Sequence, residues 1–332
     1  MILSDKVINS INKYLKVSNH CVISVGIYIK GRTEYITFDN NGINNNVYKY
    51  DIGSISKTFT AHLVLKLHEE KKINIYDSID KYLDLKKGKY PRIIELLSHT
   101  AGYHKLTPIE ITIPNLMFKE YSRRNVYEKI KNDDIIKCLN RRRKHKVGTY
   151  GYSDFAYAVL GLIVSKVFNT SFGDVLKRFI KEDLNLLKTE LAYEAIRDIK
   201  PYIKNKEVEF WKWNKDNPYL SGGGIVSTIE DMLKYITNQL ESEENFIIMA
   251  HNPQKVSSHI VPCLGWHTYQ NSNQYWHVGG VSTFRSSLIF NKKRRIGLIV
   301  MGNAKGLKRG NVHYIAKQIY SEINRNKIKL VK

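Results

Sequence analysis

The spacing of apolar residues along the chain separates helix-like from strand-like segments. Helical spacing predicts helices at residues 4–15, 57–70, 92–98, 155–167, 172–180, 229–240 and 312–323. Runs rich in Val, Ile and aromatic residues predict strands at 21–29, 33–38, 265–269, 274–278, 282–290 and 295–301. The last third of the chain is therefore predicted to consist of strands followed by one final helix.

Polar stretches interrupt this pattern and are predicted to be loops. They cover residues 40–46, 104–135 and 201–220. Loops often carry the variable walls of binding sites, so we expect residues 104–135 to form a lid or a substrate wall. No internal repeat and no low-complexity segment is visible in the sequence.

A serine and a lysine stand three residues apart where a helix is predicted to start. The segment is Asp51-Ile52-Gly53-Ser54-Ile55-Ser56-Lys57. Positions i and i+3 share one face of a helix, so the Lys57 amine can take the proton of the Ser54 hydroxyl and make it a nucleophile. The alternative interpretation is a helix-capping serine beside a surface lysine. The motif is short, so other motifs along the chain have to decide between the two interpretations.

The charge of the chain is its most unusual property. Its 332 residues carry 53 Lys and Arg against 31 Asp and Glu, a net charge of +22. Such a charge favours anionic partners or substrates. Compositional drift is the preferred explanation, however, because the basic residues are spread along the chain. The densest basic run, residues 141–146, either steers anions toward a site or is a solvated helix end. No motif of a nucleic-acid-binding module is present, and we expect no nucleic acid partner.

Cysteine usage and the N-terminus bear on cofactors and location. The three cysteines, Cys21, Cys138 and Cys263, are widely spaced, which argues against a disulfide framework and a structural zinc site. We expect neither a metal nor a cofactor. The chain starts without the pattern of a signal peptide and holds no apolar run long enough for a transmembrane helix. A cytoplasmic location is the expectation, and secretion or association with the cell envelope is the alternative.

Two further motifs come after the Ser54 segment in a fixed order. They are Tyr152-Ser153-Asp154 and His277-Val278-Gly279-Gly280. With Ser54-Ile55-Ser56-Lys57 they resemble the three motifs of the serine β-lactamase and penicillin-binding-protein superfamily. The similarity is strongest to its class C-like branch of D-alanyl-D-alanine carboxypeptidases, D-amino-acid peptidases and esterases. Landmarks around residues 96–100, 222–231, 264–266 and 301–303 match as well, so the resemblance runs from about residue 20 to about 320.

The resemblance implies an α/β (α+β) fold in two lobes of a single β-lactamase-like domain. One lobe, about 1–60 and 256–332, would be an antiparallel sheet with the first and last helices packed on it. The other lobe, about 61–255, would be mainly helical. Ser54 would lie between the lobes and carry an acyl group during hydrolysis, with the backbone N–H groups of Ser54 and Gly280 stabilising the oxyanion.

The residues leave open which group is the base. A Tyr152 phenolate can accept the Ser54 proton, or Lys57 accepts it and Tyr152 relays a proton to the leaving group. His277, expected on an edge strand, precedes Gly279 and Gly280, and these glycines would let a substrate backbone lie alongside. His99 is expected to hold its loop in place.

The middle motif has a second interpretation. Ser153-Asp154-Phe155 resembles the Ser-Asp-Asn of class A β-lactamases, but it lacks the Asn and lies far from Ser54. The segment 182–185 is a near match to the class A deacylating Glu segment at the wrong spacing. We therefore prefer the interpretation in which Tyr152 leads the motif.

Two positions depart from the superfamily pattern. Asp154 stands where Asn is usual. A carboxylate there would hold Lys57 protonated and so favour Tyr152 as the base. It would also repel a carboxylate of the substrate and attract an ammonium group. His277 stands in place of Lys and removes a fixed positive charge unless it is protonated, a charge that Arg285 or the 141–146 run could replace. We therefore expect a serine hydrolase acting on a peptide, amide or ester. The alternatives are a β-lactamase and a non-catalytic binding protein that keeps the fold.

Overall fold

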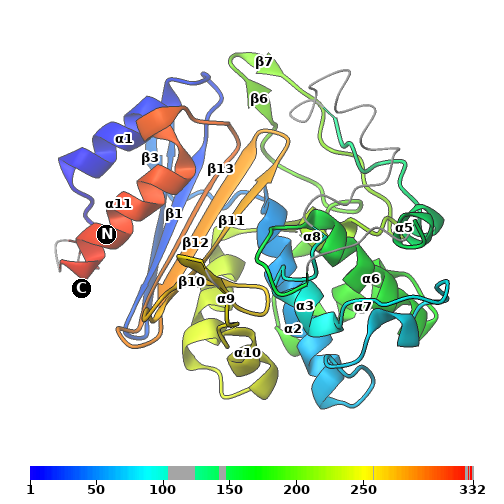
Figure 1. Ribbon diagram of the computed structural model, residues 1–332. Helices are drawn as coiled ribbons and strands as arrows, with labels where there is room; N and C mark the ends of the chain where they lie inside the picture. Colours follow the sequence, from blue (N-terminus) through cyan, green and yellow to red (C-terminus); the bar gives the residue numbers. More distant parts are fainter. Residues whose placement is uncertain (104–123, 142–146, 257, 326–327, 329, 331–332) are drawn as a thin grey trace.

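The protein is built around one large antiparallel sheet that has helices on both faces (Figure 1). The computed structural model describes residues 1–103, 124–141, 147–256, 258–325, 328 and 330. The sheet has eight strands in the order β3-β2-β1-β13-β12-β11-β10-β9, so strands from the two ends of the chain meet at its centre. The strands are β1 (Ile23–Ile29), β2 (Arg32–Asp39), β3 (Gly42–Asn44), β9 (Ile260–Pro262), β10 (His267–Tyr269), β11 (Gln274–Val281), β12 (Phe284–Asn291) and β13 (Ile296–Gly302).

Two helices from opposite ends of the chain cover one face of this sheet. They are α1 (Asp5–Leu15) and α11 (Val312–Asn324), and they lie side by side in Figure 1. The Ser4 side chain caps α1 by accepting the Val7 N–H, as the sequence predicts. On this face the alternate residues Ile23, Val25 and Ile27 of β1 pack with the apolar side of both helices.

The other face of the sheet carries α9 (Ile229–Glu241), which contacts β1 and β13. Two glycines make this contact close. A Cβ on Gly26 would lie 3.0 Å from side-chain atoms of Ile229 and Leu233, and one on Gly297 would lie 2.2 Å from Ile236 Cγ2. The sequence placed α9 in the helical lobe. The boundaries of the two lobes remain a prediction, but α9 itself packs on the sheet.

The remaining helices form the other side of the molecule. They are α2 (Ser56–Glu69), α3 (Ile93–Leu97), α5 (Asn132–Leu139), α6 (Asp154–Phe168), α7 (Phe172–Arg178), α8 (Leu220–Gly223) and α10 (Asn245–Ala250), with the short helical turns η1 (Gly53–Ile55), η2 (Ile79–Lys81) and η3 (Phe179–Asp183). A further turn, η4 (Lys308–Gly310), contacts α1 and α11 instead. Helix α2 is buried along almost its whole length, and it contacts α6, α8 and α10. The α/β class with an antiparallel sheet is therefore confirmed.

Several predicted loops contain regular structure. The stretch 40–46 holds β3, which pairs with β2, and 201–220 holds the hairpin of β6 (Tyr202–Ile203) and β7 (Lys206–Glu207). Helix α5 begins within 104–135, while residues 104–123 of the expected lid lie outside the described residues. Strand β9 and helix α10 were also not predicted, because each is short and tertiary pairing stabilises it.

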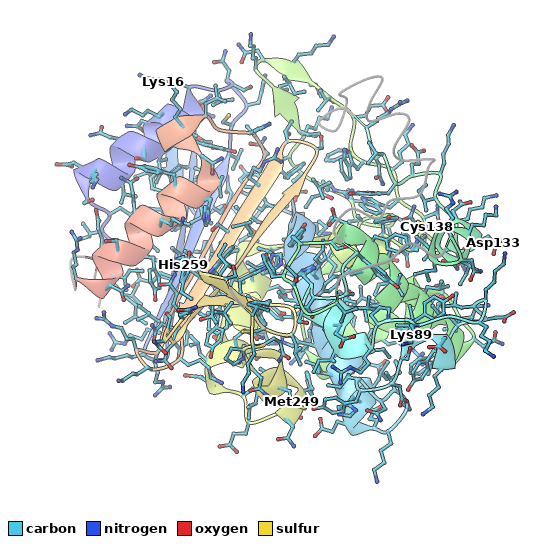
Figure 2. All side chains as sticks on the ribbon, viewed as in Figure 1. Lys16, Lys89, Asp133, Cys138, Met249 and His259 are labelled. Carbon is cyan, nitrogen blue, oxygen red and sulfur yellow. The ribbon has the colours of Figure 1, made fainter. Side chains whose placement is uncertain are left out.

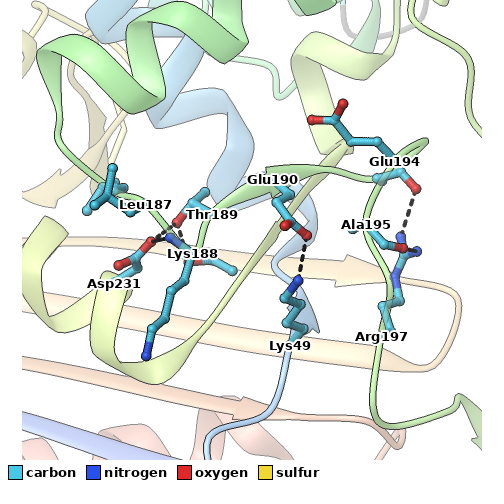
Figure 3. A network of polar contacts seen from close by, with 12 residues as sticks. Lys49, Leu187, Lys188, Thr189, Glu190, Glu194, Ala195, Arg197 and Asp231 are labelled. Atoms are coloured by element: carbon cyan, nitrogen blue, oxygen red, sulfur yellow. Dashed lines mark hydrogen bonds and ion pairs between the residues drawn. The ribbon is translucent and has the colours of Figure 1, made fainter.

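A small sheet fixes the strand that leads into Ser54. Strand β4 (Tyr50–Asp51) pairs with β8 (Ile225–Ser227), which also pairs with β5 (Glu190–Leu191). Lys49 forms an ion pair with Glu190 at 2.7 Å, and Asp231 accepts hydrogen bonds from Thr189 and from the Lys188 N–H (Figure 3).

The neighbouring residue Asp51 carries a more deeply buried ion pair. Its carboxylate binds the Arg197 guanidinium with both oxygens, at 2.7 and 3.0 Å, and both side chains are at most 6% exposed. This contact ties the residues just before Ser54 to the loop that follows β5.

Charged side chains cover the surface on all sides. Lys16 and Lys89, both exposed, project from opposite sides of the molecule in Figure 2. The three cysteines are buried and form no disulfide. Within the described ranges no single helix has both the length and the apolar character to span a membrane; one bent pair, α6 followed by the segment Phe172–Asp183, meets both criteria together with an 85° bend.

We predict that Arg197→Met lowers the free energy of unfolding by about 3–5 kcal/mol, because it leaves the Asp51 carboxylate buried without its partner. The matched control is Lys49→Met, which removes a half-exposed ion pair and should cost at most about 1 kcal/mol. Urea unfolding of both variants measures the difference. Equal losses of unfolding free energy in the two variants would show that the buried Asp51–Arg197 ion pair stabilises the fold no more than the Lys49–Glu190 pair does.

Candidate active site

Ser54 lies in the short turn η1, directly before α2. Gly53 takes a left-handed backbone conformation (φ +54°) and packs so closely on β11 that an added Cβ would lie 2.4 Å from the Gly280 nitrogen. On the other side of this contact, a Cβ on Gly279 would lie 1.9 Å from the Ile52 carbonyl oxygen. The glycines thus let the serine-bearing turn approach the strand closely.

Lys57 is completely buried beside Ser54. Its Nζ donates to the Ser54 Oγ at 3.2 Å and to the Gly222 carbonyl oxygen at 2.7 Å, and it lies 2.7 Å from Asp154 Oδ1. A lysine ammonium has three N–H donors, and here three acceptors surround it. The Lys57 amine is therefore held in a fixed position, with one N–H directed at the Ser54 hydroxyl.

The ring of Tyr152 lies next to the Lys57 amine. The residue as a whole is 36% exposed, and the Lys57 Nζ lies 5.2 Å from the ring centroid. Desolvation by the groups packed around the phenol raises its pKa well above the ordinary value, and the nearby Asp154 charge raises it further, while an interaction with Ser54 lowers it. Tyr152 is therefore a neutral phenol that can donate a proton.

Asp154 contacts both of the groups that the sequence offers as the base or its partner, directly at Lys57 and through its charge at Tyr152. It contacts Lys57, as predicted, at the first turn of α6, and the Ser153 side chain caps that helix. Whether Asp154 favours Tyr152 as base stays a prediction, because the carboxylate contacts the Lys57 amine but also raises the pKa of Tyr152. The second carboxylate oxygen accepts a hydrogen bond from the Tyr127 hydroxyl at 3.2 Å.

Three buried histidines surround Tyr152. The ring centroids of His99, His267 and His277 lie 4.4, 6.2 and 6.2 Å from that of Tyr152. Burial lowers the pKa of all three, to about 4 for His267, so they are uncharged at neutral pH. His277 therefore does not restore the positive charge that a lysine would supply at its position.

The hydrogen bonds of these histidines show what each can offer. His277 Nδ1 bonds to the Val278 carbonyl, which leaves its buried Nε2 as an acceptor without a partner among the described residues. His267 Nε2 bonds to the Tyr150 hydroxyl at 2.9 Å. His99 accepts the Ser153 N–H at 3.1 Å and adopts a left-handed backbone conformation, which fits the predicted role of holding its loop.

A cavity of about 560 Å³ opens beside Ser54. Its walls include Tyr152, His277, Gly279 and Gly280, so the structure brings these predicted site residues together around the serine. Two cations, Arg285 and Lys305, also line it. Arg285 is one of the groups that the sequence offered as a substitute for the missing lysine charge; of the 141–146 run only Arg141 lies within the described residues.

Strand β11 is not the edge strand that the sequence predicted, because β10 and β9 continue the sheet beyond it. Among the described residues, however, β10 pairs with β11 only at Trp276, so the half of β11 from Val278 to Val281 has no strand on the side away from β12. Gly280 is exposed on this half and Gly279 is buried against Ile52. Gly280 is therefore placed to meet a substrate, whereas Gly279 mainly permits packing.

Five residues that line this cavity were not predicted from the sequence as site residues. They are Tyr150, His267, Trp276, Ser282 and Lys305, and none belongs to the three motifs. Position in the sequence gave a signal for His267, which directly follows the matched landmark at 264–266, and for Trp276, which directly precedes the His277 motif.

Comparisons with known proteins identify the family of this chain. The model of the family described as Beta-lactamase matches residues 44–320. This chain belongs to the Beta-lactamase family. The resemblance to serine β-lactamases and penicillin-binding proteins is thereby confirmed.

Proteins that are similar to this chain carry different names. Protein flp from Staphylococcus aureus (strain NCTC 8325 / PS 47) is 24% identical over 295 residues, covering 82% of this chain and 55% of that protein. The teichoic acid D-alanine hydrolase of Staphylococcus aureus is 27% identical over 260 residues, covering 73% and 60%. The chain thus spans little more than half the length of these curated relatives. A class C β-lactamase structure from Rhodobacter sphaeroides matches the fold with a TM-score of 0.78, 15% identity and coverage of 97% and 100%.

The described histidines near Ser54 are not arranged as metal ligands. Across the described part of the chain, no group of three or more His, Cys, Asp or Glu side chains is placed to hold a metal ion. The histidines around Tyr152 serve as neutral hydrogen-bonding groups in this structure.

We predict a pH dependence of stability from His267. Its pKa falls from 6.5 in the unfolded chain to about 4 in the fold, so only the unfolded chain takes up the proton between these values. The free energy of unfolding should therefore be unaffected above about pH 6.5 and should fall by roughly 3 kcal/mol as the pH drops to 4. His267→Gln should lose this part of the acid sensitivity in urea unfolding at pH 7 and 4.5. An unchanged pH dependence in the variant would contradict the assignment.

Proposed function

We propose that the protein is a serine hydrolase that transfers the acyl group of an ester or amide to Ser54 and then to water. The observation that carries this proposal is the contact between the Ser54 Oγ and the Nζ of the fully buried Lys57, at 3.2 Å. A nucleophile within hydrogen-bonding reach of a group that a third residue orients is the arrangement that covalent catalysis requires. Asp154 is that third residue.

The chemical steps follow from these contacts. The Lys57 amine, once it has lost its extra proton, accepts the hydroxyl proton of Ser54 as Oγ attacks the carbonyl carbon. The bond from that carbon to the leaving oxygen or nitrogen breaks, and the leaving group takes a proton from the neutral Tyr152 phenol. Water then attacks the acyl-serine and gives a proton to the Tyr152 phenolate. Lys57 returns its proton to the Ser54 Oγ as the acid is released.

The oxyanion of each step needs hydrogen-bond donors close to Ser54. The exposed Gly280, whose nitrogen lies against Gly53, is placed on the wall of the same cavity. The backbone N–H groups of Ser54 and Gly280 are therefore the proposed donors.

The substrate class is inferred from charges around the serine. Neutral His277 and the Asp154 carboxylate give no support to binding a carboxylate next to the reacting carbonyl. The similarity to a teichoic acid D-alanine hydrolase supports an ester substrate, and the net charge of +22 suits a substrate attached to an anionic polymer. A D-amino-acid peptidase or carboxypeptidase uses the same chemistry on an amide.

A β-lactamase is the second candidate function. Arg285 and Lys305 in the cavity wall favour it, because they supply cations that a β-lactam carboxylate would need. Hydrolysis of a chromogenic cephalosporin at a rate similar to that of simple esters would support this candidate over the first. The non-catalytic alternative is disfavoured because Ser54, Lys57 and Tyr152 are all present and in contact.

We predict that Ser54→Ala and Lys57→Ala each lower kcat/KM for a phenyl ester by at least about a thousandfold, because each removes a group that acts as a unit with the other. Rates are measured with 4-nitrophenyl acetate. The control is Lys66→Ala, which should keep the wild-type rate because Lys66 forms its ion pairs on the surface of α2. Activity that survives in Ser54→Ala would contradict the proposal.

Asp154→Leu should lower kcat/KM for ester hydrolysis by about tenfold or more, because it removes one of the three acceptors that hold the Lys57 amine beside Ser54. The matched control is Asp154→Asn, which keeps a carbonyl oxygen as an acceptor and should lose less activity. Initial rates with 4-nitrophenyl acetate measure both variants. A rate in Asp154→Leu equal to that of the wild type would show that Asp154 does not position the amine.

A further inference from the structure

A second and much smaller hollow also opens onto Ser54. Its volume is about 40 Å³, and Asp154 and Gly223 form part of its wall. Most of the remaining wall is aromatic and consists of Tyr127, Trp211, Trp213 and Tyr219. Neither the three motifs nor the proposed reaction steps use these aromatic residues.

The aromatic wall is held in place by contacts between two distant segments. Tyr127 stacks on Tyr219 with ring centroids 4.1 Å apart, and the Trp211 ring meets the Tyr127 ring edge-on at 6.1 Å. The Asn217 amide donates to the Tyr127 carbonyl at 2.7 Å and accepts the Tyr219 N–H. These hydrogen bonds fix the hollow before any ligand enters.

Asp154 gives the hollow a negative group. One carboxylate oxygen contacts Lys57 and the other accepts from Tyr127, and the side chain is still 38% exposed. An ionised carboxylate accepts about four hydrogen bonds, so it has room for further donors. Aromatic faces beside a carboxylate are the surroundings that bind an ammonium group, through cation–π attraction and charge.

The size of the hollow restricts what fits. A water-sized group needs about 10–15 Å³ on this scale, so 40 Å³ holds about three such groups. One ammonium and one methyl group fit within it, whereas a branched or aromatic side chain does not.

We propose that this hollow binds the α-ammonium group and the small side chain of an aminoacyl substrate. The preferred substrates would then be alanyl or glycyl esters or amides, with the leaving group in the larger cavity. The assignment rests on the proposed serine hydrolase function, because it places the acyl group attached to Ser54. If the hollow is only part of the apolar packing, a neutral acyl group of the same shape should be accepted equally well.

The test compares two esters of the same phenol that differ only in charge. An alanyl ester, as either enantiomer, and an isobutyryl ester have the same shape, since a methyl group replaces the ammonium. Each kcat/KM is divided by the rate of hydroxide hydrolysis of that ester, which corrects for intrinsic reactivity. We expect the corrected ratio to favour one alanyl enantiomer at least tenfold, and a leucyl ester to be at least tenfold poorer than the alanyl ester.

Substitutions at Trp213 test whether the wall of the small hollow causes the preference for the alanyl ester. Trp213→Leu should reduce the alanyl-to-isobutyryl ratio to below about threefold, whereas Trp213→Phe, which keeps an aromatic face, should retain most of it. Trp266→Leu is the matched control, because Trp266 is also buried but lines neither cavity. It should leave the ratio unchanged. A corrected ratio near one in the wild type, or a preference that survives in Trp213→Leu, overturns the assignment.

A binding measurement separates this inference from the proposed function. In Ser54→Ala, alaninamide should bind at least tenfold more tightly than isobutyramide by NMR titration. If the wild type hydrolyses both esters equally in a Ser54-dependent way, the hydrolase stands and the ammonium site fails. If no ester is hydrolysed but alaninamide is still preferred, the ammonium site stands and the hydrolase fails.

Discussion

A fully buried lysine amine, surrounded by three acceptors, is the constraint on which this site depends. Its partners come from separate parts of the chain: Ser54 from the turn before its own helix, Gly222 from α8 and Asp154 from the start of α6. A buried charge without such partners costs several kcal/mol. The fold therefore has to hold these three elements together, and in doing so it positions Ser54, the proposed nucleophile.

The parts of the site that could be predicted from the sequence are those fixed by local geometry. Ser54 and Lys57 share a face because one helical turn separates them, and Ser153 begins α6 because its side chain accepts the Ala156 N–H. His267 and Trp213 could not be predicted in this way, because tertiary packing alone brings them to Ser54. The same holds for β3, a three-residue strand that is stable only against β2.

Burial changes the charges that the sequence suggests. His277 is neutral in the fold, and Asp154 both pairs with Lys57 and raises the pKa of Tyr152. The site therefore combines a neutral phenol with a buried amine that a carboxylate contacts. Positive charge is found at Arg285 and Lys305, on the wall of the larger cavity. The two hollows beside Ser54 thus differ in charge, and under the proposed function this difference favours a substrate whose two ends match it.

The most direct test of the central claim is covalent trapping of the nucleophile. The protein is treated with a fluorophosphonate, and the modified residue is located by mass spectrometry of its peptides. One adduct on Ser54 in the wild type, and none in folded Ser54→Ala, is the result that this account predicts. An adduct on another residue, or no adduct on wild-type protein shown to be folded, would contradict the assignment of Ser54 as the nucleophile.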